Sequence, residues 1–207
     1  MLKMRVGHTP THKWLKTDLA LLRWLRASKL NVGAAETAFN ENIKWRTDND
    51  MDSILQEDWS YWIREYYFDC SATDYDGRPV CTGDISEWDL RQAIVSGKGD
   101  KLLRYMIKTV EEHPPVCEHL KRWGVSLFVR FLTAHETYYP YGTHKVIIIN
   151  AAGVFHVVLN IVRPVLSKPM QESLYVFGTD KAEWRKELLS MVPENELAPH
   201  FGGTKII

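Results

Sequence analysis

The chain has 207 residues, 45% of them hydrophobic and 25% charged, enough to bury one full core with room for a small helical appendage. These proportions exclude a disordered or low-complexity chain. Its 26 basic and 26 acidic residues cancel overall, yet residues 1–30 carry a net +6 and residues 48–89 a net −10. A basic N-terminal face would attract anionic membranes by about 1 kcal/mol per well-placed cation, but clustered charge also serves solubility.

Cysteine usage and the N-terminus both indicate a cytoplasmic protein. The three cysteines, Cys70, Cys81 and Cys117, are an odd number without paired spacing, which suits a reducing compartment. Pro10 and polar residues stand where the apolar part of a secretory signal would follow the first charges, so no such signal is expected.

The first elements in chain order are two helices. Thr17 and Asn31 stand at N-cap positions before runs of apolar residues at helical spacing, which predicts a helical hairpin. Residues 75–78 form a turn signal before a short apolar run. The remaining predicted elements are a strand at 79–81, helices at 89–110 and 126–137, a strand at 146–149, a helix at 154–166, a strand at 173–177 and a helix at 182–190.

The apolar stretch 146–166 is the most informative part of the chain. Four consecutive β-branched residues, Val146 to Ile149, predict a buried strand of an α/β sheet. The helix that follows has only His156, Asn160 and Arg163 as polar side chains. Its pattern fits a core helix or a helix that covers a lipid. The three interruptions and Gly153 argue against one membrane-spanning helix, so we expect a soluble protein.

Several blocks in a fixed order resemble the CRAL-TRIO lipid-binding domain of phosphatidylinositol- and tocopherol-transfer proteins, over residues 18 to 204. The blocks are Leu21 to Lys29, Asp76 to Val80, Tyr139-Pro140, Ile148 to Ala151, the helix ending Arg163 to Ser167, Phe177-Gly178, and Leu197-Ala198-Pro199 with Phe201 to Thr204. The resemblance implies a small mixed or parallel sheet flanked by helices, with an N-terminal helical region at 1–60 and a shortened lipid-binding domain at 61–207.

The chain departs from the family pattern after Gly124. Family members have a further strand, a turn and the start of a helix there, roughly 20 residues at ordinary element lengths, and this chain lacks them. The missing strand would lie beside residues 146–149, so we expect the sheet to be one strand short. Its neighbours must then pair differently or leave hydrogen bonds unmade.

The headgroup positions of the phosphatidylinositol-binding branch are also changed. Ser28 with Lys29, Tyr141 and Ser173 stand at those positions, so only Lys29 is retained. Recognition of an inositol phosphate needs several charge-assisted bonds at once. A neutral lipophile, or a lipid bound mainly by its chains, therefore fits this chain better.

The resemblance implies binding and intermembrane transfer of a hydrophobic ligand by a cytoplasmic protein that visits membranes transiently. The helix 154–166 resembles the family's mobile gate, with Gly153 as its hinge. The expected lipid contacts are Phe155, Val158, Ile161 and Val162 of the gate and Ile147, Ile149 and Val176 of the sheet floor. Because alternation along a strand can turn any floor residue to the other face, the assignment of sides stays open.

Other function classes find little support. Residues 113–119 gather two His, a Cys and a Glu at a spacing unlike known zinc sites, and no phosphate loop or GxSxG elbow is present. We therefore expect no enzyme, cofactor or metal, and the dispersed tryptophans argue against nucleic-acid binding. The alternative is a non-carrying interaction or membrane-peripheral module, or an unstable variant, whose cavity is lost with the missing strand. The oligomeric state stays open.

Overall fold

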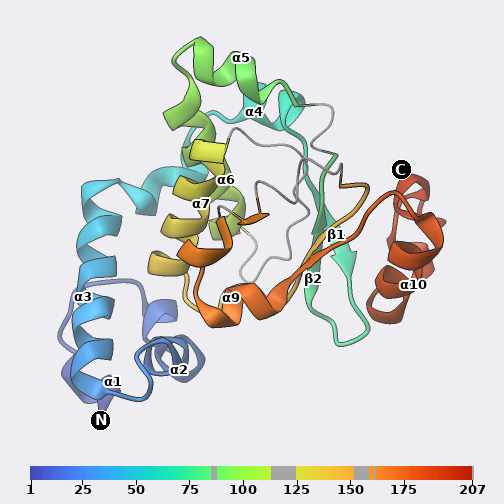
Figure 1. Ribbon diagram of the computed structural model, residues 1–207. Coiled ribbons are helices and arrows are strands. Elements are labelled where there is room, and N and C mark those ends of the chain that lie inside the picture. The colour runs from blue at the N-terminus through green and yellow to red at the C-terminus, as the bar shows by residue number, and fades with distance from the viewer. Residues whose placement is uncertain (85–87, 113–124, 152–158, 161, 207) are drawn as a thin grey trace. The chain divides into compact units, whose positions relative to one another are not determined.

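A computed structural model describes residues 1–84, 88–112, 125–151, 159–160 and 162–206, which form two compact units (Figure 1). Unit 1 comprises residues 1–57 and 134–142, and unit 2 comprises residues 58–133 and 143–207. Unit 1 therefore contains residues 134–142 in addition to most of the predicted N-terminal region.

Unit 1 is helical. Its helices are α1 (Leu2–Arg5), α2 (Asp18–Ala27), α3 (Val32–Asp48) and the end of α7 (Val125–Tyr138), with 3₁₀ turns at Lys13–Lys16 and Met51–Gln56. Both predicted N-caps are confirmed: the Thr17 hydroxyl accepts a hydrogen bond from the Ala20 amide, and the Asn31 side chain accepts one from the Ala34 amide. These bonds satisfy amides that would otherwise lack a partner in the first turn of each helix.

The core of unit 1 lies among its first three helices and is made of Leu2, Val6, Leu15, Leu21, Trp24, Ala35 and Phe39. Trp45 stacks on Tyr138 with ring centroids 3.9 Å apart, and the Asn42 amide nitrogen donates to the Tyr138 carbonyl at 3.0 Å. These contacts hold residues 134–142 against α3. Burial lowers the pKa of His135 to about 4, so this histidine is neutral at physiological pH.

Unit 2 contains the strands. Its elements are α4 (Ser60–Glu65), β1 (Asp69–Thr73), β2 (Pro79–Thr82), α5 (Leu90–Val95), α6 (Gly99–Glu112), the start of α7, β3 (Val146–Ile148), α9 (Lys168–Ser173), β4 (Leu174–Val176) and α10 (Lys181–Met191). The single helix predicted at 89–110 is wrong, because Gly97 adopts a left-handed φ of 74° and breaks it into α5 and α6. The charge-rich region before β1 gave no signal for α4.

Strands β1 and β2 form an antiparallel hairpin, with Ala72 opposite Val80. The Asp74 carboxylate accepts hydrogen bonds from the Asp76 and Arg78 amides, which closes the predicted turn. The hairpin brings Cys70 beside Cys81, and the two form a disulfide. The spacing of the cysteines gave no signal for this pair, because strand pairing joins cysteines that are 11 positions apart in sequence.

Strands β3 and β4 form a second, parallel sheet of two strands, and unit 2 also holds α6, the start of α7, α9 and α10. The predicted class, α/β with a small mixed or parallel sheet among helices, is confirmed. In the described part of the chain β3 pairs with β4 alone. The strand predicted to be missing would have been its second neighbour.

Candidate functional site

The β3–β4 pair has two faces, and its register assigns each side chain to one of them. Val146 lies opposite Leu174, Ile147 opposite Tyr175, and Ile148 opposite Val176. In a parallel pair, residues in register point to the same side, and successive residues point to opposite sides. The pairing continues past the strands, because the Phe177 amide donates to the Ile148 carbonyl at 2.7 Å.

One face, here called the α10 face, is closed by a hydrophobic cluster. Ile147 and Ile149 pack there with Trp184 and Leu188 of α10, and Phe177 packs against the same cluster. The other members are Ala72, Val80, Val192, Leu197, Ala198 and Phe201. Two of the three predicted floor residues therefore lie beneath a fixed helix and the C-terminal segment.

Polar contacts fix α10 to the strands. Asn150, two residues after β3, adopts a left-handed φ of 52°, and its side-chain oxygen accepts a hydrogen bond from the Trp184 indole at 3.2 Å. At the other end, the Lys145 ammonium pairs with Glu187 at 2.8 Å and lies 4.3 Å from the centre of the Tyr175 ring. Asn150 was part of the resemblance, and this geometry gives it a structural role.

The C-terminal segment seals the same face. Gly203 lies so close to Leu197 that a Cβ atom on it would stand 2.0 Å from the Leu197 carbonyl oxygen, so only glycine fits. Gly202 has a φ of 83°, and its carbonyl accepts a hydrogen bond from the Arg185 Nε at 2.8 Å. The Phe-Gly-Gly-Thr block thus serves to close the chain tightly onto α10.

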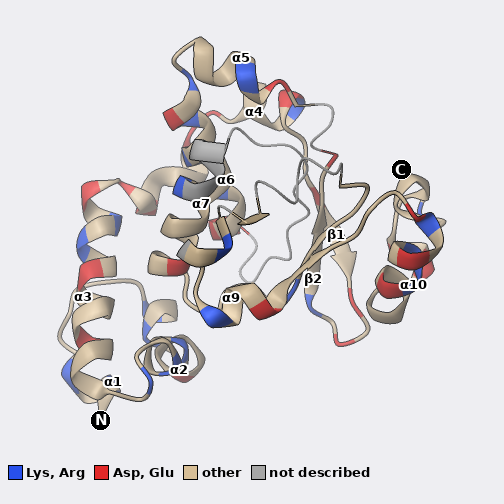
Figure 2. Ribbon diagram, viewed as in Figure 1, with Lys and Arg blue, Asp and Glu red and all other residues tan. Residues whose placement is uncertain are grey.

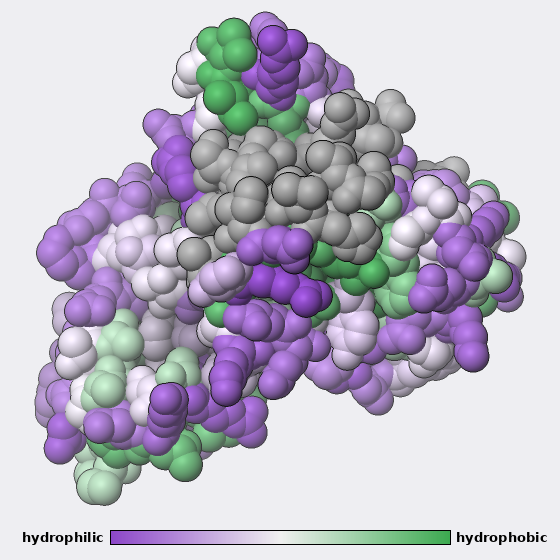
Figure 3. Space-filling view, viewed as in Figure 1, coloured by the Kyte–Doolittle hydropathy of each residue, from purple (hydrophilic) through white to green (hydrophobic). Residues whose placement is uncertain are grey.

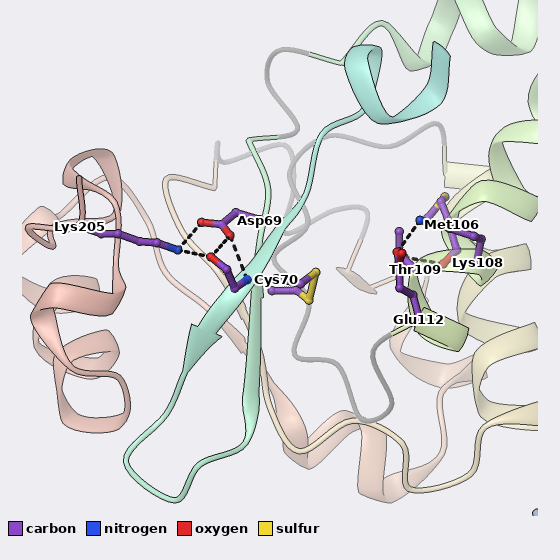
Figure 4. Close-up of a disulfide and its surroundings, with 9 residues drawn as sticks. Asp69, Cys70, Met106, Lys108, Thr109, Glu112 and Lys205 are labelled. Carbon is purple, nitrogen blue, oxygen red and sulfur yellow. Dashed lines mark hydrogen bonds and ion pairs between the residues drawn. A yellow bond between two sulfur atoms is a disulfide. The ribbon is translucent and has the colours of Figure 1, made fainter. Parts of the chain in front are cut away.

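A lysine ties this segment to the hairpin, as Figure 4 shows beside the disulfide. The Lys205 ammonium lies 2.6 Å from the Asp69 carboxylate and 2.6 Å from the Ser71 hydroxyl. Burial acts to raise the pKa of Asp69, but hydrogen bonds from Lys205 and Ser71 outweigh it and hold the pKa below its ordinary value. The carboxylate is therefore charged at neutral pH.

The second face, here called the opposite face, carries Val146, Ile148, Leu174 and Val176. Val146, Ile148 and Leu174 are buried, and Val176 is partly buried. Of the predicted floor residues, Val176 alone lies on this side. The register therefore separates Val176 from Ile147 and Ile149, and it adds Val146 and Ile148, which the sequence did not single out.

The segment that joins β3 to β4 has one buried side where the structure describes it. Leu159, Val162, Leu166 and Met170 are buried, while Asn160 and Arg163 are exposed. These residues do not belong to one helix, because a 3₁₀ turn at Arg163–Val165 separates residues 159–160 and 162 from α9. Val162 is completely buried. Gly153, Phe155, Val158 and Ile161 lie outside the described residues.

The structure places the predicted headgroup residue, Lys29, and one further lysine, Lys108, in different parts of the chain. Lys29 is exposed in unit 1, where it follows α2 with a left-handed φ of 51°. Lys108 on α6 is buried and pairs with Glu112 one turn later (Figure 4). Sequence reasoning missed Lys108, although a lysine between Ile107 and Val110 on a mostly buried helix was a signal for it.

Three further observations concern alternative sites. Among the described residues, no three His, Cys, Asp or Glu gather as a metal site would need, and residues 113–119 lie outside that part. No helix in the same part is long and apolar enough to cross a membrane. A hollow of about 810 Å³ runs along α10 and is lined by Lys181, Ala182, Arg185, Lys186, Leu189 and Ser190.

Comparison with known proteins gives consistent results. Residues 113–203 match the CRAL/TRIO domain family. The SEC14 cytosolic factor of Eremothecium gossypii is 27% identical over 90% of this chain and 69% of its own length. The SEC14 cytosolic factors of Yarrowia lipolytica and Kluyveromyces lactis are 26% and 25% identical over 90% of the chain, and over 43% and 70% of their own lengths.

The fold agrees as well. The crystal structure of Sfh5 superposes with a TM-score of 0.64 over 88% of this chain and 70% of that one, at 14% identity. The alignment with the Eremothecium protein is 219 positions long, whereas 90% of this chain is about 186 residues. About 30 aligned positions therefore have no residue in this chain, which agrees with a segment missing relative to the relatives.

Proposed function

We propose that this chain, whose residues 113–203 match the CRAL/TRIO domain family, binds a hydrophobic ligand and transfers it between membranes without chemical conversion. The ligand class is a phospholipid or a neutral lipophile. The observation that carries the proposal is the match of residues 113–203 to the CRAL/TRIO domain, on a fold shared with Sfh5. That matched range contains both β3 and β4 and the segment that joins them.

The ligand's apolar part lies, in this proposal, against the opposite face of the β3–β4 pair. The α10 face is already filled by Trp184, Leu188 and Phe201 and fixed by hydrogen bonds, so it has no side free for a ligand. Ile148 and Val176 then form the floor, while Ile147 and Ile149 anchor that floor from behind. Burial of one acyl chain contributes about 0.8 kcal/mol per CH₂ group, which supplies ample affinity.

The gate is the part of the proposal that involves residues 154–166. The described end of this segment places Val162 inside and Arg163 outside, which suits a helix that closes over a ligand with its apolar side inward. Phe155, Val158 and Ile161 are the expected chain contacts, and Gly153 is the expected hinge. Contact with a bilayer would lower the cost of opening, because the exposed apolar side then meets lipid instead of water.

Headgroup recognition is weak in this proposal. Lys29 is the one retained basic position, and the ammonium of Lys108 is already paired with Glu112. A lipid held mainly by its chains needs no set of charge-assisted bonds, so the proposal favours it over an inositol phosphate. The relatives' name, cytosolic factor, supports a cytosolic protein, and transient membrane contact belongs to the proposed transfer.

Native mass spectrometry of the purified protein, followed by organic extraction, tests the proposal. We expect a stoichiometric lipid on the wild-type chain. Val176→Trp should reduce the bound lipid, because the larger ring occupies the floor. Ile63→Trp, an enlargement at an exposed position of α4, is the matched control and should keep it.

A lipid-free chain that melts cooperatively would overturn the carrier proposal. It would favour a non-carrying interaction or membrane-peripheral module. One observation already speaks for that alternative: β3 has a single partner strand in the described part of the chain, so the floor is narrow. An oligomer without lipid would point the same way, since an uncovered apolar face promotes association.

A further inference from the structure

One corner of unit 2 exposes aliphatic side chains beside cations. Val95 at the end of α5 is 74% exposed, and Ile94 and Tyr61 are each 41% exposed. Figure 3 shows a hydrophobic patch next to strongly hydrophilic side chains over α5. We call this surface the α5 corner, and its residues are Tyr61, Arg64, Arg91, Ile94, Val95 and Lys98.

The fold builds this corner rigidly. Helix α5 buries Leu90 and Ala93, and this leaves Val95 on the outside of its last turn. The left-handed Gly97 then turns the chain, and the Lys98 amide donates to the Ala93 carbonyl at 2.8 Å. This hydrogen-bonded turn ends α5 and fixes where its last side chains point. The aliphatic pair therefore stands at the tip of a tight helix–turn–helix.

Cations surround the aromatic member of the corner. The Lys98 ammonium lies 4.8 Å from the centre of the Tyr61 ring, and the Arg64 guanidinium lies 6.0 Å from the same ring. Arg64 also pairs with Glu65 at 3.0 Å, so part of its charge is offset. Arg91 is exposed and stands three and four positions before Ile94 and Val95, which puts it on the same side of α5. Figure 2 shows a basic segment on α5. Arg64, Arg91 and Lys98 thus give the corner three cations, with Glu65 beside Arg64 and the exposed Asp89 and Asp100 near the ends of α5 and α6.

We propose that the α5 corner is the surface by which this protein docks on anionic bilayers. This inference rests on the proposed function, because a lipid carrier has to reach a membrane. Tyrosine is favoured at the level of the headgroups, aliphatic tips enter the acyl boundary, and Lys and Arg extend toward anionic headgroups. The corner presents all three kinds of side chain on one rigid turn.

Its size and charge favour a bilayer over a protein partner. A stable protein–protein interface takes about 20–30 residues on each side, whereas the corner offers six. A few cations and two aliphatic tips give weak, reversible membrane binding, because each well-placed cation contributes about a fivefold gain in affinity. Reversible contact is what repeated visits between two membranes require.

The test is co-sedimentation of the whole chain with phosphatidylcholine vesicles, at low and at high salt. The vesicles are used with and without about 30% phosphatidylserine, which makes them resemble an anionic leaflet. We expect binding to the anionic vesicles that weakens with salt. Arg91→Gln with Lys98→Gln should weaken it roughly 25-fold, at about fivefold per cation. Ile94→Ser with Val95→Ser should weaken it roughly tenfold, also at high salt.

Matched controls change the same chemistry elsewhere in unit 2. Lys181→Gln with Lys186→Gln removes two cations from α10, and Tyr75→Ser removes an exposed aromatic ring from the β1–β2 turn. Both should leave vesicle binding unchanged. All these positions are exposed, and an unchanged thermal melt will show that each variant folds. Equal losses in the corner and control variants would overturn the proposal.

The result is separable from that of the lipid-loading experiment. If the wild-type chain carries lipid and the corner variants bind anionic vesicles as well as the wild type does, the corner proposal is refuted and the carrier proposal stands. Wild-type chain that carries no lipid, yet binds anionic vesicles through the corner, supports the corner and refutes carriage. Failure of lipid-loaded wild-type chain to bind any vesicle overturns the corner as a membrane surface and leaves a protein partner as the alternative.

Discussion

The two faces of the β3–β4 pair differ in how they are closed. The α10 face is filled by a cluster, fixed by the Asn150–Trp184 hydrogen bond, and sealed by the C-terminal segment. The opposite face carries Ile148 and Val176, which lie on the two strands before and after the joining segment. The side chains of both faces are largely buried, but the α10 face is packed against a fixed helix, which is why the proposal assigns the ligand to the opposite face.

The largest expected effect comes from Gly203, which tests whether the α10 face depends on its seal. Gly203→Ala should lower the free energy of unfolding by about 4 kcal/mol or more, because its Cβ would overlap backbone atoms of Leu197 that cannot yield. Chemical denaturation measures the loss. Gly178→Ala is the control and should cost little, since nothing lies within 4 Å of its Cβ position. Equal stability of the two variants would show that the seal is not tight.

A pair of isoleucine variants separates the faces directly. Ile149→Ala and Ile148→Ala should each cost about 3 kcal/mol of stability in lipid-free protein, because both side chains are buried. Only Ile148→Ala should also change the amount or chain length of the bound lipid seen by native mass spectrometry. If Ile149→Ala changed the lipid while Ile148→Ala did not, the assignment of faces would be reversed.

Reduction of the Cys70–Cys81 disulfide should have the next largest effect on the α10 face. The hairpin contributes Ala72 and Val80 to that cluster, so a looser hairpin weakens the seal. A crosslink around so short a loop contributes at most about 3 kcal/mol, and strand pairing already closes this one, so we expect a loss of about 2 kcal/mol. Thermal melts with and without reductant measure it. Cys70→Ser with Cys81→Ser should melt like the reduced chain and show no response to reductant.

Features of the fold and site that are set by residues close together in the sequence could be predicted, whereas features set by residues far apart could not. The N-caps Thr17 and Asn31 and the apolar run of β3 act within a few residues and were predictable. The side taken by Ile147 was not, since it depends on register with a strand almost 30 positions later and on the placement of α10. The cysteine pair likewise depends on the hairpin. Lys205 and Asp69 are 136 positions apart in the sequence, so their pairing could not be predicted either.

The smallest effect concerns that last contact and has a pH signature. The folded pKa of Asp69 is below its ordinary value, so the pair contributes stability at neutral pH that is lost as pH falls below about 4 and through the folded pKa. Lys205→Met should cost about 1 kcal/mol at pH 7, since both side chains are partly exposed, and should flatten the fall in stability below pH 4. Lys186→Met, which removes an exposed cation from α10, should leave that slope intact. An unchanged acid slope in Lys205→Met would mean that the C-terminal segment is held by Gly203 and its apolar contacts alone, so that the α10 face stays shut without its ion pair.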